Sequence, residues 1–159
     1  MAANPARGEE ARAFRGRVAV ANAKLAYALF RERFTGSRWD ALAARGARVQ
    51  RPLWASTSTK NPAYRDVMYV EDLIGPDTVN TMPPATIEAF RDHGEVKRTV
   101  DSNIDAERAL LADLEELGIS LESVTDKLLT DGLTSFQKSF DSLIARMKTK
   151  ATELAKAAR

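Results

Sequence analysis

The side chains best suited to chemistry lie in one short hydroxyl-rich stretch that contains a single lysine. Ser56, Ser58 and Lys60 belong to the run Ser-Thr-Ser-Thr-Lys, which directly follows the apolar residues Leu-Trp-Ala at 53–55. An ammonium group beside hydroxyl groups can hold an anionic group such as a phosphate by charge and by hydrogen bonds. From the residues alone, the stretch is either such a phosphate contact or a solvated polar loop, and both readings stay open.

We do not expect Lys60 to act as a nucleophile. An amine that forms an imine needs a depressed pKa, and burial in apolar surroundings supplies that shift. The neighbours of Lys60 are hydroxyl and amide side chains instead, so nothing in the sequence indicates desolvation of its amine. We therefore expect binding residues in this stretch and no catalytic residue.

The elements around this stretch follow the repeat of a parallel α/β fold. Residues 52–57 predict a strand, and their three consecutive apolar side chains are typical of a strand covered on both faces. Asn-Pro at 61–62 predicts a turn, 64–73 predicts a helix and 77–82 predicts a second strand. Such folds place ligands at the carboxyl ends of their strands, which is where the lysine stretch lies.

The remainder of the chain predicts helices. We expect residues 1–15 to be a disordered tail and 16–159 to form one folded portion. The first helix should bury a stripe formed by Val18, Ala21, Leu25, Ala28 and Leu29. Further helices are expected near 39–43, over 85–92 and 104–117, from 120 onward, and over 133–158.

Composition excludes several classes of protein. The chain has 24 basic and 22 acidic residues, so its formal charge of +2 gives no polyanion-binding signature, and we expect no nucleic-acid partner. It has no cysteine and one histidine, His93, so we expect no metal site and no cofactor. No apolar run approaches the roughly 20 residues that cross a bilayer, so we expect no membrane span. The absence of cysteine is compatible with a reducing, cytoplasmic environment.

Several long segments of the chain resemble the transaldolase family. The run Leu53-Trp-Ala-Ser-Thr-Ser-Thr-Lys-Asn-Pro62 is similar to the seventh strand region of the longer bacterial members, and Thr78-Val-Asn-Thr-Met-Pro-Pro-Ala-Thr86 to the eighth. The segment 16–27 resembles the helix before the seventh strand, and 120–132 resembles the C-terminal helices. The resemblance covers the chain from about residue 15 and identifies it as the C-terminal part of a family member.

This resemblance implies a fold and an activity. Transaldolases are (β/α)8 barrels of the pentose phosphate pathway that transfer a dihydroxyacetone unit between sugar phosphates through a Schiff base on a lysine of the fourth strand. The chain resembles no strand before the seventh. The expected fold is therefore a partial barrel of the α/β class, with two parallel strands, a predominantly helical remainder, and an unclosed sheet whose apolar faces are only partly covered.

The resemblance also bears on the lysine stretch. Lys60 lies near the position of a seventh-strand arginine that contacts the substrate phosphate in the family, so Lys60, Ser56 and Ser58 are expected on the phosphate side of the site. A lysine serves that role as a point charge, without the two-pronged contact of an arginine. Without the Schiff-base lysine the chain is expected to be inactive alone. It is a transferase by resemblance only, and whether it acts as an enzyme stays open.

A different class of function also fits the residues. Two parallel strands leave both sheet edges open, and an open edge invites pairing with another chain. The chain could therefore be a helical interaction or oligomerisation module derived from barrel sequence, which self-associates through its sheet edges.

Overall fold

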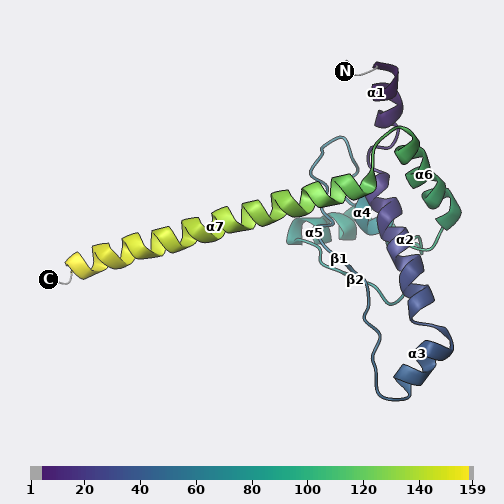
Figure 1. Cartoon of the computed structure of the whole chain (residues 1–159), viewed down its shortest axis with the longest axis horizontal. Helices are drawn as coiled ribbons and strands as arrows, with labels where there is room; N and C mark the ends of the chain where they lie inside the picture. Colours follow the sequence, from purple (N-terminus) through teal and green to yellow (C-terminus); the bar gives the residue numbers. More distant parts are fainter. Residues whose placement is uncertain (1–4, 158–159) are drawn as a thin grey trace. The chain divides into compact units, whose positions relative to one another are not determined.

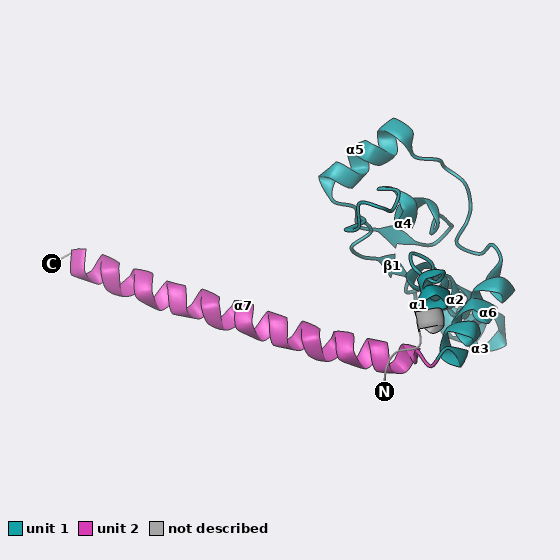
Figure 2. Cartoon of the chain, turned by 90° about the horizontal axis from the view of Figure 1, so that it is seen from above, with its two compact units in different colours: residues 1–117 teal, residues 118–159 magenta. Residues whose placement is uncertain are grey.

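The computed structural model describes residues 5–157, which divide into two compact units between Leu117 and Gly118 (Figure 2). That 16–159 form one portion of a barrel stays a prediction. Gly118 has a φ of +81°, a conformation that ends the preceding helix. None of the 37 residues of the helix that follows, all of them within the described part, is buried.

The first unit contains eight of the nine elements found among the described residues (Figure 1). In chain order they are α1 (Pro5–Arg12), α2 (Val18–Arg33), α3 (Gly36–Ala43), β1 (Leu53–Trp54), α4 (Met68–Glu71), β2 (Val79–Asn80), α5 (Pro84–His93) and α6 (Ile104–Glu116). The second unit is the single helix α7 (Leu121–Ala157). This composition confirms the prediction of two parallel strands in a predominantly helical chain.

The two strands pair in parallel and are shorter than the sequence indicates. Leu53 lies opposite Val79 and Trp54 opposite Asn80, and the Thr81 amide donates to the Trp54 carbonyl at 3.1 Å. The expectation of a first strand covered on both faces is wrong, because Leu53 is 53% exposed whereas Trp54 is buried. The unclosed sheet with partly covered faces is confirmed.

The core of the first unit forms around Trp54. Its indole N–H donates to the Leu73 carbonyl at 3.1 Å, so the ring is held by a hydrogen bond as well as by packing. The fully buried Tyr27 donates its hydroxyl to the Pro76 carbonyl at 3.1 Å. The buried core cluster consists of Val20, Tyr27, Trp54, Leu73 and Val100.

Helix α2 buries a different face from the one that its apolar spacing predicts. Of the expected stripe only Ala21 is buried; Val18, Leu25 and Ala28 are half-buried, and Leu29 is 50% exposed. The buried residues are Val20, Ala21, Lys24 and Tyr27. Apolar spacing missed this face because a lysine lies in its middle, and α6 beside α2 (Figure 1) supplies the carboxylate that compensates its charge.

The helix expected over 64–73 contracts to the four residues of α4. Tight turns replace its first half: the Tyr64 amide donates to the Asn61 carbonyl and the Met68 amide to the Arg65 carbonyl, each across three residues. The Asn61 side chain also accepts from the Ala63 amide at 3.0 Å. Such side-chain bonds to the local backbone compete with helix formation.

The two helices expected after residue 120 are one continuous helix, α7, because Gly132 does not interrupt it. A glycine inside a helix costs about 1 kcal/mol relative to alanine, which a helix this long tolerates. Among the helices of residues 5–157, none has the length and apolar character of a membrane-spanning segment.

The N-terminal segment contains structure that we did not expect. Helix α1 occupies Pro5–Arg12 within the segment 1–15 that we predicted to be disordered, and 1–4 lie outside the described residues. Its alanines, arginines and glutamates favour a helix. The boundary at residue 15 between a tail and a folded portion stays a prediction.

Candidate phosphate-binding site

The predicted site lies in the loop that begins at the carboxyl end of β1. Ser56 turns the chain there with a φ of +57°. The next residue, Thr57, is buried and donates its hydroxyl to the Asn80 side-chain oxygen at 2.7 Å. Because Asn80 ends β2, this hydrogen bond ties the loop to the carboxyl end of the neighbouring strand. The loop is therefore anchored at the edge of the sheet where α/β folds bind ligands.

The structure brings two of the three predicted site residues together. The ammonium group of the exposed Lys60 donates to the hydroxyl oxygen of Ser58, which leaves the Ser58 hydroxyl proton available to another acceptor. Ser56 stands apart from this pair. It lines a cavity of about 340 Å³ between β1 and α2, together with Ala19, Ala23 and Leu53.

The backbone amides from Ser56 to Asn61 donate no hydrogen bonds within the described part of the fold. Free amides, a hydroxyl and an ammonium group in one short loop form a concentration of donors suited to an anion. Lys60 is exposed rather than surrounded by the apolar groups that imine chemistry requires. The loop therefore presents an exposed ammonium group beside a hydroxyl group, and its binding of an anion stays a prediction.

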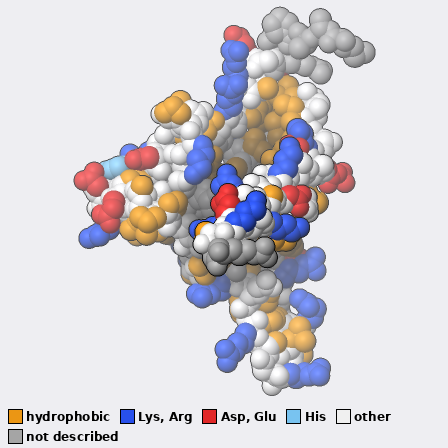
Figure 3. Space-filling model, turned by 90° about the vertical axis from the view of Figure 1, so that its left-hand side faces the viewer, with side chains coloured by type: hydrophobic (Ala, Val, Ile, Leu, Met, Phe, Trp, Pro, Cys, Tyr) orange, Lys and Arg blue, Asp and Glu red, His pale blue; other side chains and the backbone are white. Residues whose placement is uncertain are grey.

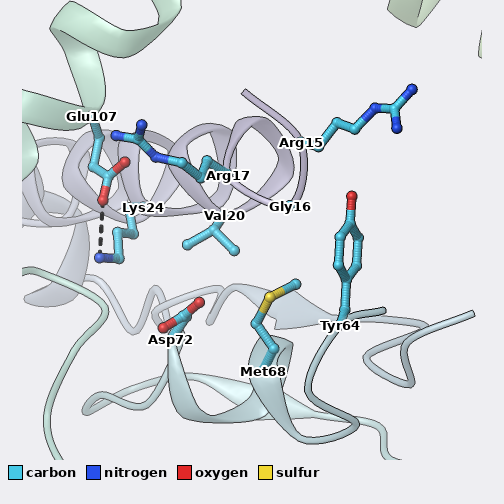
Figure 4. Close-up of a pocket in the computed structure, with 9 residues that line it drawn as sticks. All are labelled: Arg15, Gly16, Arg17, Val20, Lys24, Tyr64, Met68, Asp72 and Glu107. Carbon is cyan, nitrogen blue, oxygen red and sulfur yellow. Dashed lines mark hydrogen bonds and ion pairs between the residues drawn. The ribbon is translucent and has the colours of Figure 1, made fainter. Parts of the chain in front are cut away.

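A second polar site, which the sequence analysis missed, lies between α2, α4 and α6 (Figure 4). Lys24 pairs with Glu107 at 3.1 Å, and their side chains are only 8% and 15% exposed. Lys24 also donates to the Ser102 hydroxyl at 3.4 Å. Burial raises the pKa of the nearby Asp72 carboxyl, and the positive charge of Lys24 partly offsets that rise.

These charges border a cavity of about 290 Å³, with Arg15 and Tyr64 on the other side of it in Figure 4. Since Lys24 is already paired, its main effect is to join α2 to α6. The sequence does contain a signal for the burial of Lys24. This lysine lies between Val20 and Tyr27 at helical spacing, inside a stripe that is otherwise apolar.

A third group of charges joins the turn before α4 to the end of α5. Arg65 pairs with Glu71 at 2.8 Å and donates to the His93 carbonyl at 2.7 Å. The His93 imidazole contacts Asp66 at 2.8 Å and Asp92 at 3.1 Å. Figure 3 shows the histidine at the surface between acidic side chains. Within residues 5–157, no three histidine or carboxylate side chains are placed to hold a metal ion.

The contacts of His93 lead to a prediction about pH. The hydrogen bond that His93 donates to Asp66, followed by the one that it donates to Asp92, raises the pKa of His93 above its ordinary value of about 6.5. A raised folded-state pKa means that this pairing stabilises the fold fully below the ordinary pKa and loses its contribution as pH rises through the raised value. At the acidic end, the hydrogen bond that Asp66 accepts from His93 lowers the Asp66 pKa, so the contribution of that carboxylate is lost as pH falls through the lowered value.

An NMR titration measures this directly, because His93 is the only histidine. We expect its ring protons to titrate above pH 6.5, and Asp66→Asn to lower the midpoint. Asp105→Asn is the control, since that carboxylate pairs with Arg108 instead. A wild-type midpoint at or below the ordinary value would contradict the contacts.

Comparison with known proteins identifies the family to which the chain is similar. Residues 2–147 match the family model described as transaldolase/fructose-6-phosphate aldolase. The chain is 48% identical over 144 residues to a transaldolase of Trichodesmium erythraeum, a match that covers 89% of this chain and 38% of that protein. It is 50% identical over 136 residues to a transaldolase of a Parafrankia species, covering 85% of this chain and 37% of the relative.

A transaldolase of Thermobifida fusca gives the same result, with 49% identity over 140 residues, 87% of this chain and 38% of the relative. The chain therefore spans less than two fifths of the length of these relatives. Within that span the identity is high and nearly the whole chain is matched. The chain belongs to the transaldolase/fructose-6-phosphate aldolase family.

Proposed function

We propose that this chain supplies the phosphate-binding side of a transaldolase active site. The reaction is the transfer of a dihydroxyacetone unit between sugar phosphates of the pentose phosphate pathway, in the cytoplasm. The family match supports the reaction class. The observation that carries the proposal is the Lys60–Ser58 pair in a loop that the Thr57–Asn80 hydrogen bond anchors at the carboxyl ends of both strands.

Each of the three site residues has a distinct proposed role. Lys60 provides the positive charge that attracts a sugar phosphate, and charge-assisted hydrogen bonds of this kind are stronger than neutral ones. Ser58 already orients the ammonium group and donates its own proton to a phosphate oxygen. Ser56, on the cavity beside β1, is proposed to reach the phosphate only when a neighbouring strand closes that side of the loop.

The imine-forming lysine is proposed to lie in the part of a family-length protein that this chain does not span. Such a protein can be made by putting this chain in place of the matched 144 residues of the Trichodesmium erythraeum relative. We expect this chimera to transfer dihydroxyacetone, and borohydride with a ketose phosphate to label a lysine outside the present chain. The isolated chain is expected to show neither turnover nor labelling. A label on any of its own lysines would refute the proposed location of the imine-forming lysine.

Variants of the chimera test the phosphate role of Lys60. Losing one charge-assisted hydrogen bond costs about 1.5–3 kcal/mol, so Lys60→Ala is expected to raise KM about 10–100-fold with little change in kcat. Lys60→Arg is expected to restore binding because the charge returns. Lys97→Ala removes an exposed lysine outside the loop and serves as the matched control. Unchanged KM in Lys60→Ala would exclude the loop from phosphate binding.

A second candidate is the interaction module, which the exposed edge of the sheet favours. Leu53 is 53% exposed and the cavity between β1 and α2 is open to solvent. Pairing of this edge with another chain would cover both. Light scattering separates the two functions, since a monomer at all concentrations argues against self-association.

A further inference from the structure

The loop that joins β1 to α4 is fixed to the first unit at both of its ends. We call residues 57–65 the site loop. At its start, Thr57 donates its hydroxyl to the Asn80 side-chain oxygen at 2.7 Å. At its end, the Arg65 side chain donates to groups of α4 and α5. Among the described residues, every hydrogen bond made by 58–64 stays inside the site loop. The hydrogen bonds that place the loop therefore come from its two ends.

The contact at the second end is the more extensive one. The Nε and Nη2 atoms of Arg65 donate to the two carboxylate oxygens of Glu71 at 2.8 and 2.9 Å. Nη2 also donates to the His93 carbonyl oxygen at 2.7 Å. Two parallel bonds from a guanidinium group to a carboxylate define orientation as well as distance. The end of the site loop therefore has a defined position relative to α4 and α5.

Glu71, the last residue of α4, is itself held in place. Its carboxylate also accepts from the Glu95 amide at 2.9 Å, and its carbonyl oxygen accepts from the Thr99 hydroxyl at 2.5 Å. Hydrogen bonding to Arg65 lowers the pKa of Glu71, so this carboxylate is ionised at neutral pH. Arg65 is thus attached to a charged group that the segment after α5 holds in position.

The segment between Lys60 and Arg65 is short and internally hydrogen-bonded. The Asn61 carbonyl oxygen accepts from the Tyr64 amide at 3.0 Å. The Asn61 side-chain oxygen accepts from the Ala63 amide at 3.0 Å. These two bonds close a turn that directly follows Lys60 and directly precedes Arg65. A displacement of Arg65 therefore moves the turn and, with it, the lysine.

We propose that Arg65 is a positioning residue for the phosphate contact of the site loop. It holds the loop so that Lys60, oriented by Ser58, meets the phosphate group of a sugar phosphate. A binding group on a loop is effective only where supporting contacts hold its geometry. Arg65 does not bind the phosphate itself, because its guanidinium group is paired with Glu71. The role rests on the proposed function, since it adds a residue to the same site.

Substrate kinetics of the family-length chimera test the role of Arg65. Arg65→Ala is expected to raise KM for an aldose phosphate acceptor about 3–30-fold, a usual range for coupling between two groups, with little change in kcat. For the same aldose without its phosphate, KM is expected to stay within about twofold, because there is no phosphate contact to lose. Arg91→Ala, which breaks an exposed pair with Glu88 on α5, is the matched control and is expected to change neither KM.

Two further variants separate positioning from direct binding. If Arg65 bound the phosphate itself, Glu71→Gln would free its guanidinium group and lower KM. Positioning predicts that Glu71→Gln raises KM, because Arg65 loses its charged acceptor. Arg65→Ala is expected to add no more than about twofold to the KM of Lys60→Ala, since Arg65 acts through the lysine.

Each outcome bears on the proposal. A KM that rises in Lys60→Ala but not in Arg65→Ala would overturn the positioning role and leave the proposed function intact. An unchanged KM in Lys60→Ala would refute both. Equal KM rises for the two acceptors, independent effects in the double variant, or a lowered KM in Glu71→Gln would also overturn the positioning role. If the Arg65→Ala chimera fails to fold, Arg65→Gln, which keeps a hydrogen-bond donor, must show the same rise in weaker form.

Discussion

Replacing Glu107 by alanine is expected to lower the free energy of unfolding of the first unit by about 3–5 kcal/mol, the usual cost of breaking a buried ion pair from one side. Lys24 and Glu107 lie 3.1 Å apart with side chains 8% and 15% exposed. Without the carboxylate, a positive charge stays in a site that water barely reaches. Urea unfolding followed by tryptophan fluorescence measures the loss.

Two further variants isolate the cause. Lys24→Met with Glu107→Leu removes both charges and keeps similar volumes, so it is expected to recover most of the stability. Arg108→Ala breaks an exposed pair with Asp105 on the same helix and is expected to cost well under about 1 kcal/mol. If Glu107→Ala costs no more than Arg108→Ala, then Lys24 pairs with another group, and Asp72, the other carboxylate that lines the same cavity, is the one to replace next.

Replacing Trp54 by alanine is expected to cost about 3–5 kcal/mol, as for other large aromatic residues in a core. The indole packs in the cluster with Val20, Tyr27, Leu73 and Val100, which come from elements far apart in the chain. Removing the indole leaves a cavity, which these neighbours cannot close unless α2 and β1 move toward each other. The same urea experiment measures the effect, with Trp39 as the remaining fluorophore.

Two controls divide this cost into packing and hydrogen bonding. Trp54→Phe keeps most of the volume but leaves the Leu73 carbonyl without its donor, and is expected to cost about 1–3 kcal/mol. Trp39→Ala removes a half-buried ring that packs edge-on against Phe34 with centroids 4.7 Å apart, and is expected to cost less than Trp54→Ala. A Trp54→Ala cost below that of Trp39→Ala would contradict the assignment of the core.

The helix positions were largely predictable, and the α2 face shows where prediction failed. Helix α6 begins after Asn103 and buries Leu110 and Leu114 as its apolar spacing indicates. On α2 the same reasoning missed Val20, Lys24 and Tyr27, because a buried lysine is acceptable only beside a carboxylate, and this one lies 83 residues further along the chain. Spacing within one helix contains no information about such a partner.

At the candidate site, too, the local sequence identified the residues but not their tertiary contacts. Its three residues were identified from one local run, and the structure places Lys60 beside Ser58. The run does not reveal that Thr57 donates to Asn80, which lies 23 residues further along the chain, since that hydrogen bond depends on the parallel pairing of the two strands. Nor does it reveal that Ser56 faces a separate cavity.

By itself, the sequence determined the family, the helical character of the chain, the order of its two strands and the stretch that holds the candidate site. These follow from local patterns, in which neighbours along the chain fix the backbone and the apolar period. Only the tertiary structure decided which face of α2 is buried and how the site loop is anchored. Each of these depends on which distant side chain compensates a buried charge or covers an apolar surface, and that is set by packing in three dimensions.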